Sequence, residues 1–301
     1  LSSDELREMI RAIGHQRFLE QLEQEDKQFS EELAERYKDL LWDVPDFPLR
    51  DECLFQIADN YLNARRHEDA VNVFEQVWRE FPNSPVLGES LLKLAGGYLA
   101  LNRDWDAAQV LENLRDQAVD PRVRCDGILT LADCYVKLNR QSEAIAVLEG
   151  FLGESPEVSL QERVVLKLAE CYQNLDRDSD AVQVLERFLV DFPGTSVREA
   201  GRGSIREGPM LMLARCYVKL NRDSEAAEVL ETYLAEFPDS GYGLRVMLDL
   251  GQCYLRLRKT SQAVELLQTL ISENPSSPLA EKAQELLSQA QKSLAGQAGP
   301  K

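Results

Sequence analysis

Cysteine and tyrosine stand side by side in a repeated motif, which raises the question of redox or metal chemistry. The heptapeptide CYVKLNR occurs at residues 134–140 and again at 216–222, and Cys-Tyr recurs at 171–172 and 253–254. Two thiols can form a disulfide, and several thiolates that converge on one point can bind zinc. The sequence contains no C-x-x-C motif, and only two histidines accompany the six cysteines. The ligand spacing typical of a zinc site is therefore missing.

The cysteines mark equivalent positions in a repeat. Six tyrosines follow one another at intervals of 37 residues, with one longer interval of 45. They are Tyr61, Tyr98, Tyr135, Tyr172, Tyr217 and Tyr254. A fixed period of this kind predicts a solenoid, in place of the two globular domains that a length of 301 residues would suggest.

Each unit has the pattern of two amphipathic helices. Apolar residues recur at intervals of three, four and seven residues on both sides of the tyrosine, and a proline such as Pro156 closes the unit. Residues that tolerate a positive φ and suit a tight turn separate the two helices, namely Asn102, Asn139, Asp176 and Asn221. The side chains placed to cap the second helix are Asp104, Asp178, Asp223 and Thr260.

This arrangement decides how the cysteines are interpreted. Equivalent positions of stacked helices lie roughly 8–10 Å apart, whereas a disulfide needs Cα atoms within about 7 Å, and zinc ligands must converge more closely still. We therefore predict that the cysteines fill space as small apolar side chains. They are Cys134, Cys171, Cys216 and Cys253 in register, with Cys53 and Cys125 outside it. No metal and no cofactor are expected.

Composition excludes several classes of function. A net charge of −18 disfavours nucleic acid and anionic lipid as partners, because both require clustered Lys and Arg. The longest apolar runs are too short to insert into a membrane. The sequence also lacks the pattern of a signal peptide, which is a basic segment followed by an apolar stretch. With two histidines and no glycine-rich phosphate loop, an enzyme is not expected.

The repeat resembles the tetratricopeptide repeat (TPR), whose pattern is W-x2-L-G-x2-Y…A-x3-F…P. The resemblance covers residues 51–275 as six units, although the period is 37 and the tryptophan is replaced by Leu54, Leu91, Ile128, Val165, Met210 and Met247. It implies an all-α fold, a right-handed α-solenoid of stacked antiparallel helix pairs. It also implies a non-catalytic protein–protein interaction scaffold, which binds a peptide or a helix of a partner protein in a concave groove.

The two ends differ from the repeats. Residues 276–294 are expected to form a C-terminal capping helix, and residues 295–301 a disordered tail. Residues 1–45 are predicted to be helical, either as one long helix or as a degenerate repeat whose second helix covers residues 30–43. The alternative function is therefore a structural assembly component that forms a homo-oligomer through residues 1–45.

In the family that the sequence resembles, the first helix of each unit lines the groove. The positions around each tyrosine then give an acidic N-terminal half and a basic C-terminal half, flanked by an apolar ladder. The candidate groove residues are Asp59, Leu62, Leu99, Asp133, Val136, Lys137, Arg163, Arg215, Val218, Lys219, Arg245, Leu255 and Arg256. The lysines of the family's carboxylate clamp are absent, since Phe55, Leu92, Leu129 and Leu166 occupy their places.

The longer interval of 45 residues reflects an insertion at residues 197–208. It carries Arg198, Arg202 and Arg206 among three glycines, and one interpretation is a flexible basic loop that gates the groove or contacts an acidic partner. The competing interpretation is a tolerated surface insertion, because lengthening a loop costs little entropy.

Localisation depends on two signals that disagree. The linkers between units are similar to those of bacterial envelope TPR proteins, such as outer-membrane assembly lipoproteins and the Tol-associated periplasmic protein. This resemblance favours the periplasm or a membrane tether upstream of Leu1. Six cysteines without partners favour the cytoplasm instead.

Overall fold

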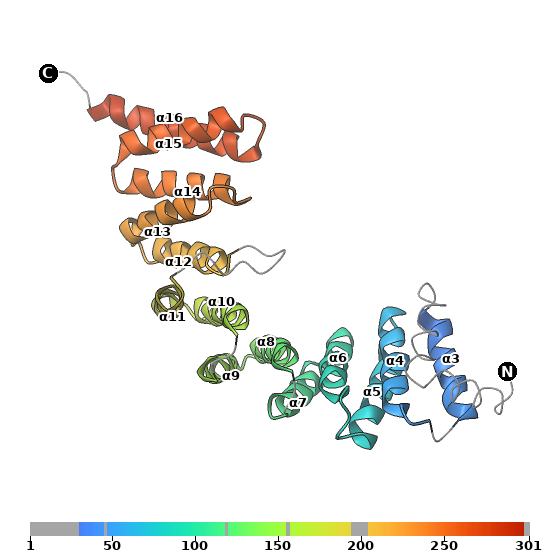
Figure 1. Ribbon diagram of the computed structural model, residues 1–301. Helices are drawn as coiled ribbons and strands as arrows, with labels where there is room; N and C mark the ends of the chain where they lie inside the picture. Colours follow the sequence, from blue (N-terminus) through green and yellow to red (C-terminus); the bar gives the residue numbers. More distant parts are fainter. Residues whose placement is uncertain (1–29, 45–46, 118–119, 155–156, 194–203, 298–301) are drawn as a thin grey trace. The chain divides into compact units, whose positions relative to one another are not determined.

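A computed structural model describes residues 30–44, 47–117, 120–154, 157–193 and 204–297 (Figure 1). All fourteen regular elements across these residues are α-helices. They are α3 (Ser30–Asp43), α4 (Arg50–Asn63), α5 (His67–Glu80), α6 (Leu87–Ala100), α7 (Asp104–Arg115), α8 (Pro121–Lys137), α9 (Gln141–Gly153), α10 (Val158–Asn174), α11 (Asp178–Asp191), α12 (Glu207–Lys219), α13 (Asp223–Glu236), α14 (Gly243–Arg256), α15 (Thr260–Glu273) and α16 (Pro278–Gln297). Among the described helices, none combines the length and the apolar character that a membrane span requires.

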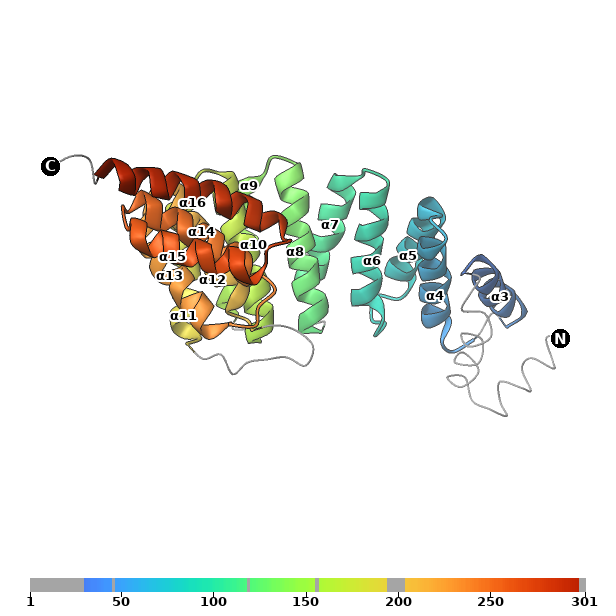
Figure 2. The ribbon, with the colours of Figure 1, turned by 90° about the horizontal axis from the view of Figure 1, so that it is seen from above.

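The chain divides into two compact units, Leu1–Val147 (unit 1) and Leu148–Lys301 (unit 2), and the boundary falls within α9. In unit 1, each helix from α3 to α8 packs against the next one in the chain. In unit 2, each helix from α10 to α16 does the same, and first helices also pack on one another, as α10 on α12 (Figures 1 and 2). The prediction of an all-α solenoid built from helix pairs is confirmed.

Each first helix ends in the same tight turn. Asn139 has a φ of 58°, its N–H donates to the carbonyl of Val136, and the N–H of Arg140 donates to the carbonyl of Tyr135. These two bonds form a Schellman motif, which satisfies carbonyls that the helix end leaves free. The predicted positive φ is confirmed at all four Asn and Asp positions. Arg65 and Arg258 adopt it in the first and last units.

The predicted capping residues of the second helices are wrong by one position. Asp104 is the first residue of α7 itself, and the flanking position belongs to Arg103, which makes no side-chain cap. Asp178, Asp223 and Thr260 likewise begin α11, α13 and α15. The turn residue and the cation that follows it complete the Schellman motif, so the helix starts one residue earlier than the capping pattern suggested.

Small residues of one helix pack against large residues of a neighbouring one, as Gly127 does against Leu114 and Gly251 against Leu267. The six cysteines are all buried and free, which confirms their prediction as packing residues. Burial raises the pKa of the Cys134 and Cys253 thiols to about 11 and that of Cys53 to about 12. These thiols therefore stay protonated at neutral pH.

The ends of the array extend the helix pairing. Helix α3 packs against α4 in the place of a preceding second helix, and residues 1–29 of the predicted N-terminal segment lie outside the described residues. At the other end, α16 packs on α15 and α14 and buries Ala283 and Ala290. It continues to Gln297, so residues 295–297, expected to be disordered, are helical. Ala295 and Gln297 favour a helix, and the helix extends through them in spite of Gly296.

Candidate functional site

Unit 2 contains a cavity of about 670 Å³ on the face formed by the first helices. The cavity lies across α10, α12 and α14, with one side chain from α13 behind them. It is lined by Gln173, Leu211, Ala214, Arg215, Val218, Lys219, Leu230, Tyr242, Arg245, Asp249, Gln252, Cys253 and Arg256. We call it the groove pocket.

The groove pocket gathers part of the predicted site. Five of the candidate groove residues lie in its lining, and these are Arg215, Val218, Lys219, Arg245 and Arg256. Its other candidate neighbours, Arg163 of α10 and Leu255 of α14, are half-buried but lie outside the lining. Val218, which holds the place of Leu255 one repeat earlier, does line the cavity, so the position after the tyrosine reaches the pocket from α12 and not from α14.

Four cations and one carboxylate line the groove pocket, in a chain whose net charge is −18. Three of the cations have intramolecular partners. Lys219 Nζ lies 3.4 Å from Asp178 Oδ1, and Arg256 Nη1 lies 3.0 Å from Asp223 Oδ1. Arg245 Nε bonds both carboxylate oxygens of Asp249, at 3.1 and 3.0 Å.

Arg215 differs from the other three cations. Its side chain is exposed in the middle of α12, and within the described residues it forms no ion pair or hydrogen bond. A ligand carboxylate that binds Arg215 therefore displaces only water, whereas at Lys219 or Arg256 it competes with an aspartate of the protein. Arg215 is accordingly the cation most available to an anionic group.

The charged candidate residues of unit 1 include two that form ion pairs within the described structure. Asp59 is paired with Lys93 at 2.6 Å, and Lys137 with Asp104 at 3.1 Å. Asp133 is exposed on α8. The apolar candidates Leu62, Leu99 and Val136 are half-buried. In the predicted acidic half of the groove, the charge of Asp59 is therefore already neutralised by Lys93, a residue that the sequence pattern did not single out.

The predicted arginines of the insertion have different fates. Arg198 and Arg202 lie outside the described residues. Arg206 is buried, and its Nη1 donates to the carbonyls of Leu189 and Phe192, both at 2.8 Å. Its guanidinium also pairs with Glu236, with Nε 3.1 Å from Oε2. For Arg206 the prediction of a flexible, partner-facing side chain is wrong, because the guanidinium binds the C-terminal end of α11, where free carbonyls attract a cation.

A network around the repeat tyrosines was missed by the sequence reasoning. Each tyrosine donates a hydrogen bond to a glutamate of the preceding helix pair: Tyr61 to Glu35, Tyr98 to Glu75, Tyr135 to Glu112, Tyr172 to Glu149, Tyr217 to Glu186 and Tyr254 to Glu231. A cation lies 4.4–5.7 Å from each ring centre: Arg66, Arg103, Arg140, Arg177, Arg222 and Lys259. The signal was available, since a glutamate follows each of the first five tyrosines after 14 residues.

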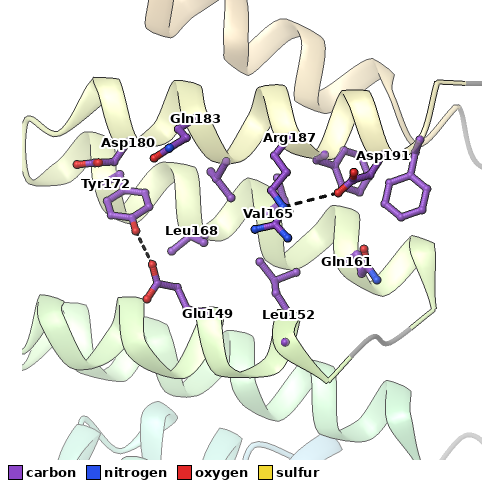
Figure 3. A pocket seen from close by; sticks show the side chains of 14 residues that line it. Glu149, Leu152, Gln161, Val165, Leu168, Tyr172, Asp180, Gln183, Arg187 and Asp191 are labelled. Atoms are coloured by element: carbon purple, nitrogen blue, oxygen red, sulfur yellow. Dashed lines mark hydrogen bonds and ion pairs between the residues drawn. The ribbon is translucent and has the colours of Figure 1, made fainter.

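A second cavity, of about 490 Å³, lies in unit 2 between α9 and α11 (Figure 3). Val165 and Leu168 of α10 form its apolar floor. Its rim is occupied by internal contacts, because Glu149 accepts a hydrogen bond from Tyr172 and Asp180 accepts one from Arg177. On α11, Arg187 and Asp191 form an ion pair at 3.8 Å. This cavity therefore offers fewer free polar groups than the groove pocket.

A comparison with known protein families identifies some of the same repeats. The family model of the tetratricopeptide repeat matches residues 52–84, 163–195, 210–240 and 245–277. No curated protein matches the chain. The matched segments cover the helix pairs that begin with α4, α10, α12 and α14. The family model does not match the pair α6–α7, although these two helices pack against each other as the matched pairs do.

Two solved structures share the fold at low identity. The C-terminal part of a TPR repeat-containing protein from Cytophaga hutchinsonii is 13% identical, with a TM-score of 0.65, covering 89% of this chain and 98% of that one. A Signal Transduction ATPase with Numerous Domains that carries a tetratricopeptide repeat sensor, from Pyrococcus horikoshii, is 15% identical with a TM-score of 0.57. That match covers 96% of this chain and 44% of the ATPase. The chain therefore carries tetratricopeptide repeats at the four matched segments, and repeats of this family generally mediate protein–protein interaction.

Proposed function

We propose that this protein is a non-catalytic interaction scaffold that holds a segment of a partner protein in the groove pocket of unit 2. One observation carries the proposal: five residues expected to line a binding groove do line a single cavity. Its volume of about 670 Å³ lies within the range of ligand sites, roughly 300–1,000 Å³.

The lining of the groove pocket suits a polypeptide. Leu211 and Val218 are half-buried apolar side chains that a partner side chain can cover. Gln252 forms no hydrogen bond within the described residues, so its amide is available to a backbone carbonyl or N–H. Apolar surface with a few convergent polar groups is typical of peptide recognition.

The reactive groups near the pocket argue against catalysis there. Cys253 is the nucleophile-bearing residue of the lining, yet it is fully buried and burial raises its pKa to about 11. A thiol of this kind reacts slowly, because the thiolate is the nucleophile. Binding is the better supported role of the pocket.

A selection from a displayed library of random peptides tests the proposal. Peptides selected on the full chain should lose binding to the Val218→Trp variant, whose indole fills the groove pocket. They should keep binding to Val190→Trp, which adds the same side chain at an exposed site of α11. Circular dichroism and thermal unfolding would verify that both variants fold. Selected peptides that bind Val218→Trp as tightly as the parent chain would contradict the proposal.

A further inference from the structure

The groove pocket is asymmetric along its length. Its lining includes Tyr242, just before α14, and Arg245, Asp249, Gln252 and Arg256 of α14, which are spaced by three and four residues along one face of the helix. From Tyr242 to Arg256 this face extends about 21 Å. The two ends of the pocket therefore present different chemistry to one ligand.

The cationic end lies at the C-terminal turns of two first helices. Lys219 is in the last turn of α12 and Arg256 is in the last turn of α14. Arg215 lies one turn before Lys219, two residues before the repeat tyrosine, and Gln252 holds the same position in α14. Three of the four cations of the pocket thus lie at this end, and one of them has no internal partner.

The opposite end is apolar and electrically balanced. Tyr242 has 59% of its surface exposed, which is unusual among the large side chains of the described residues, and it lies just before α14. The charge of Arg245 is neutralised by Asp249, because Arg245 Nε donates hydrogen bonds to both oxygens of that carboxylate. An exposed tyrosine beside Leu211 offers a surface for an apolar or aromatic side chain.

We infer that the groove pocket binds an extended acidic segment of a partner protein, with an Asp or Glu side chain on Arg215 and an apolar side chain on Tyr242. The inference rests on the proposed function and adds the class of partner. The level of Arg215 lies about 15 Å from Tyr242 along α14, which an extended chain spans with about five residues. The two features of the partner should therefore be separated by about that length.

Charge complementarity supports an acidic partner over a basic one. Away from this pocket, a protein of net charge −18 repels anions, so an acidic segment gains attraction only where cations are concentrated. Lys219 and Arg256 line the pocket, whereas their partners Asp178 and Asp223 lie outside its lining, so these two pairs present their cations to a ligand. Arg215 forms the direct contact, a charge-assisted hydrogen bond.

Labelled peptides test the inference on the full chain. The probe carries one phenylalanine and a run of aspartates separated by a Gly-Ser spacer of about three residues, and it is made in both chain directions. Fluorescence anisotropy should show that Arg215→Glu weakens binding of the better probe by about ten-fold or more. The matched control Arg187→Glu reverses an exposed charge of α11 and should leave affinity within about two-fold.

Two further measurements separate the contacts. Tyr242→Ala should weaken binding of the phenylalanine probe and leave a glycine-substituted probe unaffected. A probe with asparagines in place of aspartates should bind at least about ten-fold more weakly than the acidic one. Equal binding of the aspartate and asparagine probes, or an unchanged affinity in Arg215→Glu, would overturn the inference. If selected peptides need an open pocket but lack acidic residues, the partner class is wrong while the proposed function stands.

Discussion

Arg256 Nη1 of α14 lies 3.0 Å from Asp223 Oδ1 of α13, so a cation of the groove pocket joins two successive repeats. The same relationship joins Lys137 to Asp104 at 3.1 Å in unit 1. In both pairs the aspartate begins a second helix and the cation ends the next first helix. Each charge also complements the dipole of its own helix. These cations therefore hold repeats together, whatever they contribute to binding.

The first prediction concerns the strength of this inter-repeat pair. A double-mutant cycle on Lys137→Met and Asp104→Asn should give a coupling free energy of about 0.5 kcal/mol in denaturant unfolding, because both side chains are partly exposed. The control cycle on Arg187 and Asp191, a longer and more exposed pair within α11, should give about zero. Coupling no larger than in the control cycle would show that the pair does not link the repeats.

The second prediction concerns the hydrogen bond between Tyr172 and Glu149 (Figure 3). Tyr172→Phe removes the donor to a carboxylate and should lower the free energy of unfolding by about 1.5 kcal/mol. Glu149 is exposed, so water can solvate the carboxylate that loses its partner, and the loss stays moderate. Urea unfolding followed by circular dichroism measures it. Tyr242→Phe, at an exposed tyrosine, serves as the control and should change stability little.

The third prediction is the pH dependence of these tyrosines. Burial and the hydrogen bond to a glutamate raise the pKa of Tyr135, Tyr172 and Tyr254 to about 12, above the ordinary value of 10.0. A raised pKa favours the folded state while the phenol is protonated. Its contribution is therefore complete below about pH 10 and declines as the pH rises through 12.

Unfolding measured between neutral pH and pH 11 checks this dependence. Stability should fall above pH 10 in the parent chain, and the fall should be smaller in Tyr172→Phe, which has no phenol to ionise there. An identical decline in both proteins would mean that the loss comes from other groups.

How far the sequence predicts this molecule depends on whether a feature repeats. The Schellman turn at Asn139 and the buried Cys134 recur in the same register, so their roles could be predicted from spacing and residue type alone. The helix pairing followed from the same period. Repetition supplies several observations of one local structure, which is why these predictions agree with the fold.

Features that depend on a single contact between distant residues could not be predicted. The pairing of Asp59 with Lys93 and the burial of Arg206 follow from side-chain positions, which spacing does not specify. Tyr242 was missed because it precedes a helix and has no fixed place in the repeat pattern. The groove pocket was predicted in part, because only the residues in register with the tyrosines could be assigned to a face.

The fourth prediction concerns the cysteines. All six thiols are buried, and burial raises the pKa wherever a shift is resolved, for example at Cys53 and Cys216. A disulfide-exchange reagent such as Ellman's reagent should react slowly with the native protein at pH 8 and with all six thiols after unfolding. Rapid labelling of a native thiol would show that one of these sites opens without global unfolding.

The last prediction concerns Arg206, which joins the C-terminal end of α11 to Glu236 of α13. Arg206→Met keeps much of the apolar volume but leaves two carbonyls and a partly buried carboxylate without their donor. The expected loss is about 3 kcal/mol, because breaking a buried ion pair strands its partner. Hydrogen exchange should localise the effect, with faster exchange in the last turn of α11 and around Glu236 and little change at α15.

Arg206→Lys separates charge from geometry in this contact. An ammonium keeps the positive charge but cannot serve two carbonyls and a carboxylate with the planar fork of a guanidinium, so stability should recover only in part. Full recovery in Arg206→Lys would mean that charge near the end of α11 is sufficient. If Arg206→Met does not lower the stability, Arg206 has no structural role, and the insertion is then a tolerated surface loop. The distinction matters for the groove pocket, because α11 carries Asp178, the partner of Lys219.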